Sequence, residues 1–262
     1  MTEHVITAVD GPILTLTLNR PDKKNALTNA MYGVLADALA QADQDDRIRC
    51  VILAGNGDSF TAGNDLADFM SIAQGRGPSV RHVARFLDAL ALADKPIVAA
   101  VQGLAVGIGT TMLLHCDVVC VTPQTRLTTP FVNLALVPEA ASSLLLQARI
   151  GYARAFGMIT MGDAIDGATA VQWGLARECV APGELADRTR AIAGEIAAKP
   201  LGAVRASKRL MRDGALIASI MRRESDVFAE RLASPEAREA FQAFAEKRKP
   251  DFLSLACAPH SG

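Results

Sequence analysis

One wholly apolar segment constrains the fold of this chain more than any other feature. Residues 50–54 read Cys-Val-Ile-Leu-Ala and end at a Gly-Asn-Gly turn. A strand without polar positions suits a sheet that is covered on both faces. Further strand-like runs at residues 97–101 and 118–121 alternate with helical segments up to about residue 180. This alternation predicts an α/β fold.

The N-terminal segments give the order of the first elements. Residues 5–9 and 13–18 are rich in apolar and β-branched side chains and are separated by an Asp-Gly-Pro turn, which predicts a β-hairpin. Thr28 is expected to cap a helix that continues to Asp43, because apolar residues then recur at helical spacing. Residues 80–93 show the same spacing and predict a second helix.

The pattern changes in the last third of the chain. From Pro182 onward every segment has helical character and none has the character of a strand. The expected helices cover residues 182–199, 201–213, 215–233 and 235–248. The sequence therefore predicts two regions, an α/β core over residues 1–199 and a helical C-terminal region over residues 200–262.

Composition excludes several classes of protein. The 262 residues are 50% hydrophobic and carry a formal net charge of -1, as expected of a globular protein. Without a block of Lys and Arg, nucleic acid is not an expected partner. No apolar run is long enough to span a membrane, and no signal peptide is recognised, so we expect a cytoplasmic protein. The five cysteines and four histidines form no ligand pattern, so no metal site is expected.

Two glycine-containing loops are candidates for binding an anionic oxygen. Residues 60–66 follow the first buried strand, and residues 103–109 lead into an apolar helix at residues 110–115. Backbone N–H groups at the start of a helix lack partners and attract negative charge. A plain surface loop and a tight packing turn are the alternative interpretations. The second loop matches the dinucleotide fingerprint only at Gly107 and Gly109, which argues against a nicotinamide cofactor.

A single carboxylate provides the third candidate feature. Glu139 follows the almost wholly apolar residues 131–138 and precedes small residues. A carboxyl group in such surroundings has a raised pKa, as a general acid or base requires. The alternative is that Glu139 lies in the first turn of a helix and interacts with its dipole.

Taken together and in this order, the segments resemble the crotonase family, also called the enoyl-CoA hydratase/isomerase family. The resemblance covers nearly the whole chain. It is carried by residues 18–27 (Leu-Asn-Arg-Pro-Asp-Lys-Lys-Asn-Ala-Leu), 60–66 (Phe-Thr-Ala-Gly-Asn-Asp-Leu), 95–109 with Cys116-Asp117, 173–176 (Trp-Gly-Leu-Ala) and 244–252 (Phe-Ala-Glu-Lys-Arg-Lys-Pro-Asp-Phe).

The resemblance implies a fold, a substrate and a binding mode. The fold would be a spiral of β-β-α units with a helical C-terminal trimerisation region, and the protein would be a homotrimer or a hexamer made of two trimers. The substrate would be an acyl thioester of coenzyme A, and no separate cofactor is implied. By position, the backbone N–H groups of Asn64 and Ile108 would form the oxyanion hole that holds the thioester oxygen.

The resemblance also bears on the reaction. Family hydratases handle the attacking water with two glutamates, and those positions are Thr111 and Phe131 here. Glu139 falls where certain isomerases of the family keep one acidic base. The implied reaction is the isomerisation of a 3-enoyl-CoA to a 2-enoyl-CoA through a dienolate. Enoyl-CoA hydration by a lyase, and a catalytically silent protein that binds CoA esters, are the alternatives.

The resemblance implies contacts to coenzyme A along three segments. They are the N-terminal loop, the loop at residues 60–66 and the C-terminal helix, and the residues are Lys23, Lys24, Ala26, Leu27, Ala62, Phe244 and Lys247. The alternatives are solvated lysines and, for Phe244, a packed aromatic side chain.

Overall fold

Two sheets form the centre of the molecule. The computed structural model describes residues 3–73 and 76–256. In the larger sheet β1 and β2 form the predicted antiparallel hairpin, and every later strand joins in parallel. Its strands, in spatial order, are β1 (Val5–Asp10), β2 (Ile13–Leu18), β3 (Cys50–Gly55), β4 (Ile97–Val101), β6 (Val118–Val121) and β9 (Glu178–Cys179). The smaller sheet contains β5 (Leu104–Val106), β7 (Arg126–Thr128) and β8 (Ala164–Asp166).

The larger sheet is covered on both faces, as the apolar run at residues 50–54 predicts. Val51 and Leu53 of β3 belong to the main core beneath helices α1 (Asn29–Gln44) and α3 (His82–Leu92). Cys50 and Ile52 point to the opposite face and pack with helix α8 (Leu185–Ala197). Because side chains alternate along a strand, a run without polar residues supplies apolar contacts to both layers.

The predicted helices form with small changes at their ends. The hydroxyl of Thr28 accepts a hydrogen bond from the N–H of Met31 at 3.3 Å, which confirms Thr28 as the N-cap of α1. The helices not yet given are α2 (Leu66–Ala73), α4 (Ile108–Thr111), α5 (Ser142–Ile150), α6 (Tyr152–Phe156), α7 (Gly167–Trp173), α9 (Leu201–Met211), α10 (Gly214–Leu232), α11 (Pro235–Ala245) and α12 (Phe252–Ala256). Short turns of 3-10 helix cover Pro21–Lys23, Met112–His115, Val132–Leu134 and Pro182–Glu184, and Gly157–Met161 forms a π-helical turn.

The second glycine loop differs from the prediction. Residues 103–109 are not all loop, because Leu104–Val106 forms β5 and the helix that follows begins at Ile108 instead of Thr110. A strand of three residues pairs here with β7, which lies more than twenty residues later in the chain. No local pattern announces such a strand, since its hydrogen-bond partners are supplied by tertiary structure.

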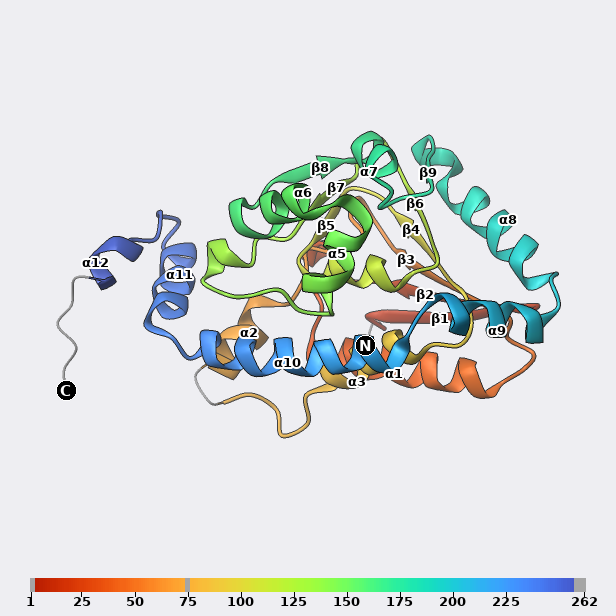
Figure 1. The fold of residues 1–262 in the computed structure, drawn as a ribbon, viewed down its shortest axis with the longest axis horizontal. Coiled ribbons are helices and arrows are strands. Elements are labelled where there is room, and N and C mark those ends of the chain that lie inside the picture. The colour runs from red at the N-terminus through yellow and green to blue at the C-terminus, as the bar shows by residue number, and fades with distance from the viewer. Residues whose placement is uncertain (1–2, 74–75, 257–262) are drawn as a thin grey trace.

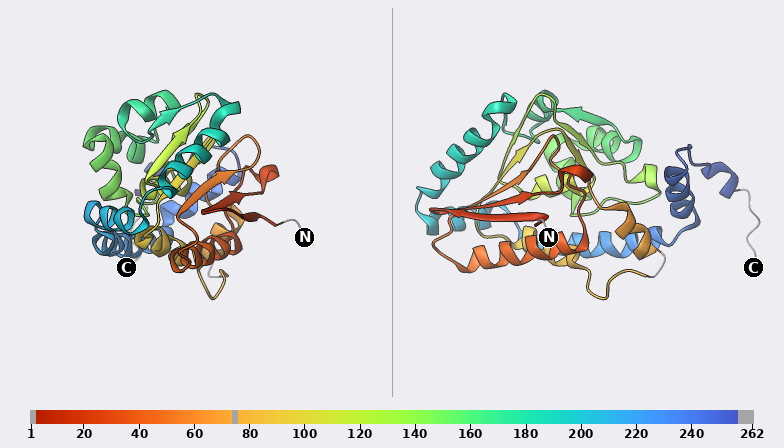
Figure 2. Two further views of the ribbon diagram at one scale, coloured as in Figure 1. Left: turned by 90° about the vertical axis from the view of Figure 1, so that its right-hand side faces the viewer. Right: turned by 180° about the vertical axis from the view of Figure 1, so that it is seen from behind.

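The C-terminal region is helical, as predicted, over its described residues. Helix α10 runs along one side of the core, and α11 and α12 extend past one end of the body (Figure 1). Seen from behind, this end lies opposite the one at which α9 packs (Figure 2). Across residues 3–73 and 76–256, no helix has the length and apolar character needed to cross a membrane.

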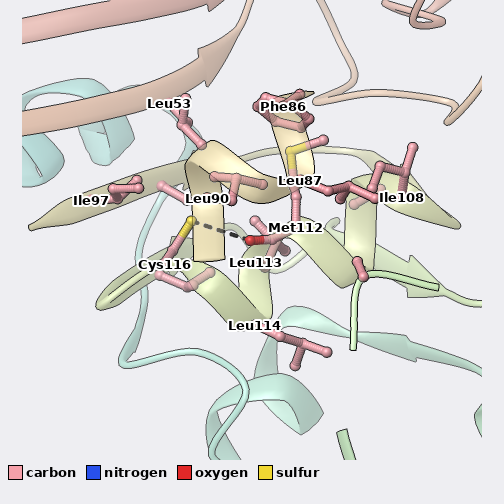
Figure 3. Close-up of a cluster of buried hydrophobic side chains, with 14 of the residues drawn as sticks. Leu53, Phe86, Leu87, Leu90, Ile97, Ile108, Met112, Leu113, Leu114 and Cys116 are labelled. Atoms are coloured by element: carbon pink, nitrogen blue, oxygen red, sulfur yellow. Dashed lines mark hydrogen bonds between the residues drawn. The ribbon is translucent and has the colours of Figure 1, made fainter. Parts of the chain in front are cut away.

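The main core lies between the larger sheet and the helices. Phe86 and Leu90 of α3 pack with Leu53, Ile97 and the residues of α4 and the turn after it (Figure 3). Phe86 is fully buried and its ring lies 5.5 Å from the ring of Tyr32. This cluster packs against α4 and the turn that follows it.

Replacing Phe86 by Ala should lower the free energy of unfolding by about 3–5 kcal/mol, because the substitution leaves a cavity in a close-packed core. The measurement is equilibrium urea unfolding at one protein concentration. Phe156→Ala is the matched control, since the Phe156 side chain is 47% exposed. Equal losses in the two variants would contradict this description of the core.

Candidate active site

A cavity of about 780 Å³ gathers residues from distant parts of the chain. The N-terminal loop, the loop after β3 and the start of α4 contribute to its lining. The segment around Phe131 and Glu139 and helices α10 and α11 contribute the other lining residues. Asn64, Ile108 and Glu139, predicted from separate motifs, all line it.

The loop after β3 presents the N–H group of Asn64. The N–H of Leu27 donates to the carbonyl of Gly63 at 2.8 Å, and the N–H of Asp65 donates to the carbonyl of Leu27 at 2.9 Å. The N–H of Asn64 lies between these two hydrogen bonds and has no acceptor among the described residues. The hydroxyl of Tyr32 donates to the side-chain oxygen of Asn64 at 2.6 Å and fixes the side chain.

The two glycine-containing loops approach each other closely at Gly63. Its φ is +91°, and a Cβ atom there would lie 2.7 Å from the carbonyl oxygen of Val106. Only glycine fits such a contact without moving the backbone. Gly63 thus lets the loop that carries Asn64 lie against the strand that leads to Ile108.

Ile108 presents its N–H group because it is the first residue of α4. The N–H groups of Thr110 and Thr111 donate to the carbonyl of Gly107 at 2.9 Å, whereas the first N–H of a helix has no partner in the helix itself. Gly107 has a φ of +54° and turns the chain into the helix. The side chain of Ile108 is anchored in the core (Figure 3), so its backbone is held firmly.

Glu139 carries a carboxyl group in largely apolar surroundings. The pKa of Glu139 is raised to about 8. Burial is the main cause and the nearby charge of Glu224 adds to it, whereas the hydrogen bond from Thr111 lowers the pKa. The Thr111 hydroxyl donates to Oε1 of Glu139 at 2.6 Å. The residue keeps partial contact with solvent through the cavity, while protein surrounds the carboxyl group on its other sides. Such a group exchanges protons near neutral pH.

Asp65 also lines the cavity, but its environment differs. An oxygen of Asp65 lies 2.6 Å from the guanidinium of Arg20. Burial opposes ionisation of this carboxyl group, but the hydrogen bonds from Arg20 and from the amides of Asp68 and Ala67 outweigh it and lower the pKa. Asp65 is therefore a permanent anion that holds the loop, and not a proton donor at neutral pH.

The residues predicted to contact coenzyme A separate into two groups. Lys23, Ala26, Ala62 and Phe244 line the cavity. The other three do not: they are Lys24, which pairs with Asp58, Leu27, which is buried, and Lys247, which is exposed.

The N-terminal loop is built around Asn25, which has a φ of +55°. Its side-chain oxygen accepts a hydrogen bond from the N–H of Arg20 at 2.7 Å, and its amide group donates to the carbonyls of Asn56 and Ser59 at 2.8 Å. These bonds tie the N-terminal loop to the loop after β3, which carries Asn64.

Some residues at the site escaped the sequence analysis. Thr111 was noted only as a missing carboxylate, but it holds Glu139. Glu224 of α10 contacts the segment that follows Glu139. The sequence does contain a pattern that marks Glu224, because it lies on the same helical stripe as the buried Ile217 and Met221. A charged residue on an apolar stripe indicates a specific buried partner. Arg248 also lines the cavity, and no local pattern marks it.

Comparison with known proteins identifies the family of this chain. A family model described as enoyl-CoA hydratase/isomerase matches residues 9–254. The chain belongs to the enoyl-CoA hydratase/isomerase family. The crotonase resemblance is thereby confirmed.

This member of the hydratase/isomerase family is similar to proteins that are named for different reactions. It is 33% identical to 1,2-epoxyphenylacetyl-CoA isomerase of Escherichia coli (strain K12), over 96% of this chain and 99% of the relative. It is 31% identical to crotonyl-CoA hydratase of Syntrophomonas wolfei, over 96% of this chain and 98% of the relative. The solved structure of an enoyl-CoA hydratase/isomerase from Pseudoalteromonas atlantica is 42% identical, with a TM-score of 0.91 over 95% of this chain and 100% of that one. The predicted crotonase fold is confirmed.

The raised pKa of Glu139 in this hydratase/isomerase makes stability depend on pH. Between the ordinary pKa of 4.5 and about 8, the folded protein keeps a proton that the unfolded chain releases. The contribution of Glu139 to the free energy of unfolding therefore falls as pH rises through this window. Glu139→Gln, which cannot ionise, should be more stable than the wild type at pH 9 by on the order of 3 kcal/mol.

The measurement is urea unfolding of both proteins at pH 5 and pH 9. The difference between them, and not the stability of either alone, reports Glu139 together with its coupling to Glu224 and Tyr32, because groups distant from Glu139 titrate in both proteins alike. A difference that is the same at the two pH values would show that the carboxyl group of Glu139 is ionised normally.

Proposed function

We propose that this enzyme isomerises 3-enoyl-CoA to 2-enoyl-CoA with Glu139 as its one acid–base residue. The observation that carries the proposal is the position of Glu139. It is a carboxyl group with a pKa of about 8, and it shares one cavity with the N–H groups of Asn64 and Ile108. A group that both accepts and returns a proton near neutral pH is what a double-bond shift requires.

The reaction follows from these three groups. The ionised Glu139 removes a proton from C2 of the thioester, and the electrons move to the thioester oxygen to form a dienolate. The two N–H groups bind that oxygen, and one such donor is worth roughly 3–4 kcal/mol in the transition state. The protonated Glu139 then delivers the proton to C4, which moves the double bond into conjugation. The apolar side chains of Phe131 and Leu136 keep water from the dienolate.

The same residues favour isomerisation over hydration. At the two positions where family hydratases carry glutamates, Thr111 donates a hydrogen bond to Glu139 and Phe131 contributes an apolar wall. Neither handles a water molecule as a carboxylate does. Asp65, the other carboxylate in the lining, is engaged by Arg20. Hydration with Glu139 as the acting group is the alternative, because relatives of similar identity include a crotonyl-CoA hydratase.

The CoA moiety is proposed to lie over the N-terminal loop. Backbone atoms from Lys24 to Leu27 would face the adenine, and Lys23 would approach a phosphate. Arg248, which forms ion pairs with Glu239 and Glu246, joins Lys23 and Phe244 in the lining near the C-terminal helices. Together these residues would recognise the nucleotide, leaving the acyl group near Glu139.

Replacing Glu139 by Gln should reduce isomerase turnover about 100- to 10,000-fold, the range typical for a positioned acid or base. Gln keeps the size of the side chain but cannot accept the C2 proton, so binding of CoA esters should change little. The assay follows formation of conjugated 2-enoyl-CoA from 3-enoyl-CoA at several chain lengths. In the wild type, turnover should rise with pH toward about 8 as Glu139 ionises.

Three outcomes of that assay separate the candidate functions. Phe131→Leu and Thr111→Ala should lose far less activity than Glu139→Gln, since neither residue transfers a proton. Wild-type hydration of crotonyl-CoA faster than isomerisation would favour the lyase. Binding of CoA esters without turnover of either substrate would indicate a catalytically silent binding protein.

We also propose that the enzyme is a homotrimer or a hexamer of two trimers. Helix α9 buries none of its residues within this chain, and the side chains of Leu210 and Met211 at its end are 90% and 87% exposed. Ile217 and Met221 of α10, by contrast, are buried in this chain's own core. The proposal therefore rests on α9, because exposed apolar side chains of this size are typical of subunit contacts.

Sedimentation at micromolar concentration should give a mass three or six times the 27.6 kDa of the chain. The double substitution Leu210→Asp and Met211→Asp should shift the population to smaller species, because charge is costly in an apolar contact. A wild-type monomer under these conditions would rule out the proposal.

A further inference from the structure

The segment that carries Glu139 has an unusual backbone. Ala140 and Ala141 both adopt left-handed conformations, with φ values of 58° and 55°. Alanine disfavours this region because its Cβ atom approaches the following carbonyl oxygen. Two such residues in succession, directly after the acid–base residue, persist only where surrounding contacts determine the conformation.

His115 makes the first of these contacts. Its Nε2 lies 2.8 Å from the carbonyl oxygen of Ala140, and its Nδ1 faces the guanidinium of Arg212. A guanidinium only donates hydrogen bonds, so Nδ1 is the acceptor and Nε2 carries the proton that it donates to Ala140. Burial, together with the charge of Arg212, lowers the pKa of His115 to about 3, so the ring is neutral.

Glu224 of α10 makes the second contact, from 83 residues away in the sequence. One carboxyl oxygen accepts a hydrogen bond from the N–H of Ala141 at 2.6 Å, and the other accepts one from the N–H of Ser143 at 2.9 Å. The carboxyl group is buried. No side chain of the segment itself caps α5, so Glu224 serves as its cap.

We infer that His115 and Glu224 are positioning residues that hold Ala140 and Ala141 in their left-handed conformations and thereby aim the Glu139 carboxyl group into the cavity. The inference rests on the proposed role of Glu139. If Glu224 served only as the cap of α5, the segment would need neither the left-handed backbone at Ala140 and Ala141 nor a hydrogen-bond partner on the Ala140 carbonyl. His115 bonds the C=O and Glu224 bonds the N–H of the same peptide group, the one between Ala140 and Ala141, which fixes the rotation of the chain just after Glu139.

The first test is Glu224→Gln. Its amide oxygen accepts from one N–H, but its NH2 group meets the other N–H and cannot accept, so one bond is lost. We expect kcat for isomerisation to fall about 10- to 100-fold while KM changes less than about twofold, since a displacement of about 1 Å has this effect on chemistry. Asp213→Ala is the matched control, because it removes the N-cap of the same helix without touching the segment.

A conservative pair at His115 tests the other contact. His115→Gln keeps an N–H donor for the Ala140 carbonyl and an acceptor for Arg212, so it should retain most of kcat. His115→Leu keeps the bulk but loses both functions and should lose kcat about tenfold or more. Equal activity of the two variants would show that packing, and not the hydrogen bond to Ala140, is what matters there.

Glycine provides a rescue that a purely structural role would not show. Ala141→Gly makes the left-handed conformation accessible without strain. In the double variant that combines Ala141→Gly with Glu224→Gln, kcat should be several-fold higher than in Glu224→Gln alone. A double variant no faster than Glu224→Gln alone would contradict the inference.

Amide hydrogen exchange of residues 139–146 separates this inference from the proposed function, because it needs no substrate. Exchange in this segment should be faster in Glu224→Gln and His115→Leu than in the wild type and the Asp213→Ala control. Unchanged exchange would overturn the inference. Faster exchange in a protein that isomerises no enoyl-CoA would uphold the two contacts and overturn the assignment of the reaction.

Discussion

The parallel pairing of β3 with β4 determines where the site forms. Because the two strands run in the same direction, the loops that follow them leave the sheet at the same edge. The pairing even continues past the strands: the N–H of Phe60 donates to the carbonyl of Gln102, and the N–H of Thr61 to that of Leu104. Asn64 and Ile108 lie shortly after these contacts, so two N–H groups from separate crossovers reach one cavity. Everything else at the site is arranged around this pair.

Burial is also the main reason why the pKa of Glu139 is raised. A carboxyl group is costly to ionise away from water, and this cost is what raises its pKa toward neutrality. The enzyme therefore carries a group that works against folding at high pH. Thr111 offsets part of that cost with one hydrogen bond, while the carboxylate of Glu224 increases it. Such an exchange of stability for reactivity is common where a protein positions an acid or base.

The helical C-terminal region takes part in the site as well as covering it. Helix α10 supplies Glu224 to the Glu139 segment, and α11 packs Phe241 against Phe131 and Leu136. Glu139 lies in one region of the chain, and Glu224, which accepts hydrogen bonds from the N–H groups of Ala141 and Ser143, lies in the other.

The sequence by itself determined the class of fold and most of the elements. An apolar run without polar positions requires cover on both faces, and helical spacing with a Thr cap marks α1, because both patterns depend on neighbouring residues alone. Family motifs located Asn64, Ile108 and Glu139, which the structure brings to one cavity. Tertiary structure decided what local patterns do not encode. The short strands β5, β7 and β8 exist because distant partners pair with them. The pKa of Glu139 is raised mainly because distant segments bury its carboxyl group, while Thr111 lowers this pKa and Glu224 raises it. The left-handed backbone at Ala140 and Ala141 is contrary to the preference of alanine, and only contacts from His115 and α10 make it stable.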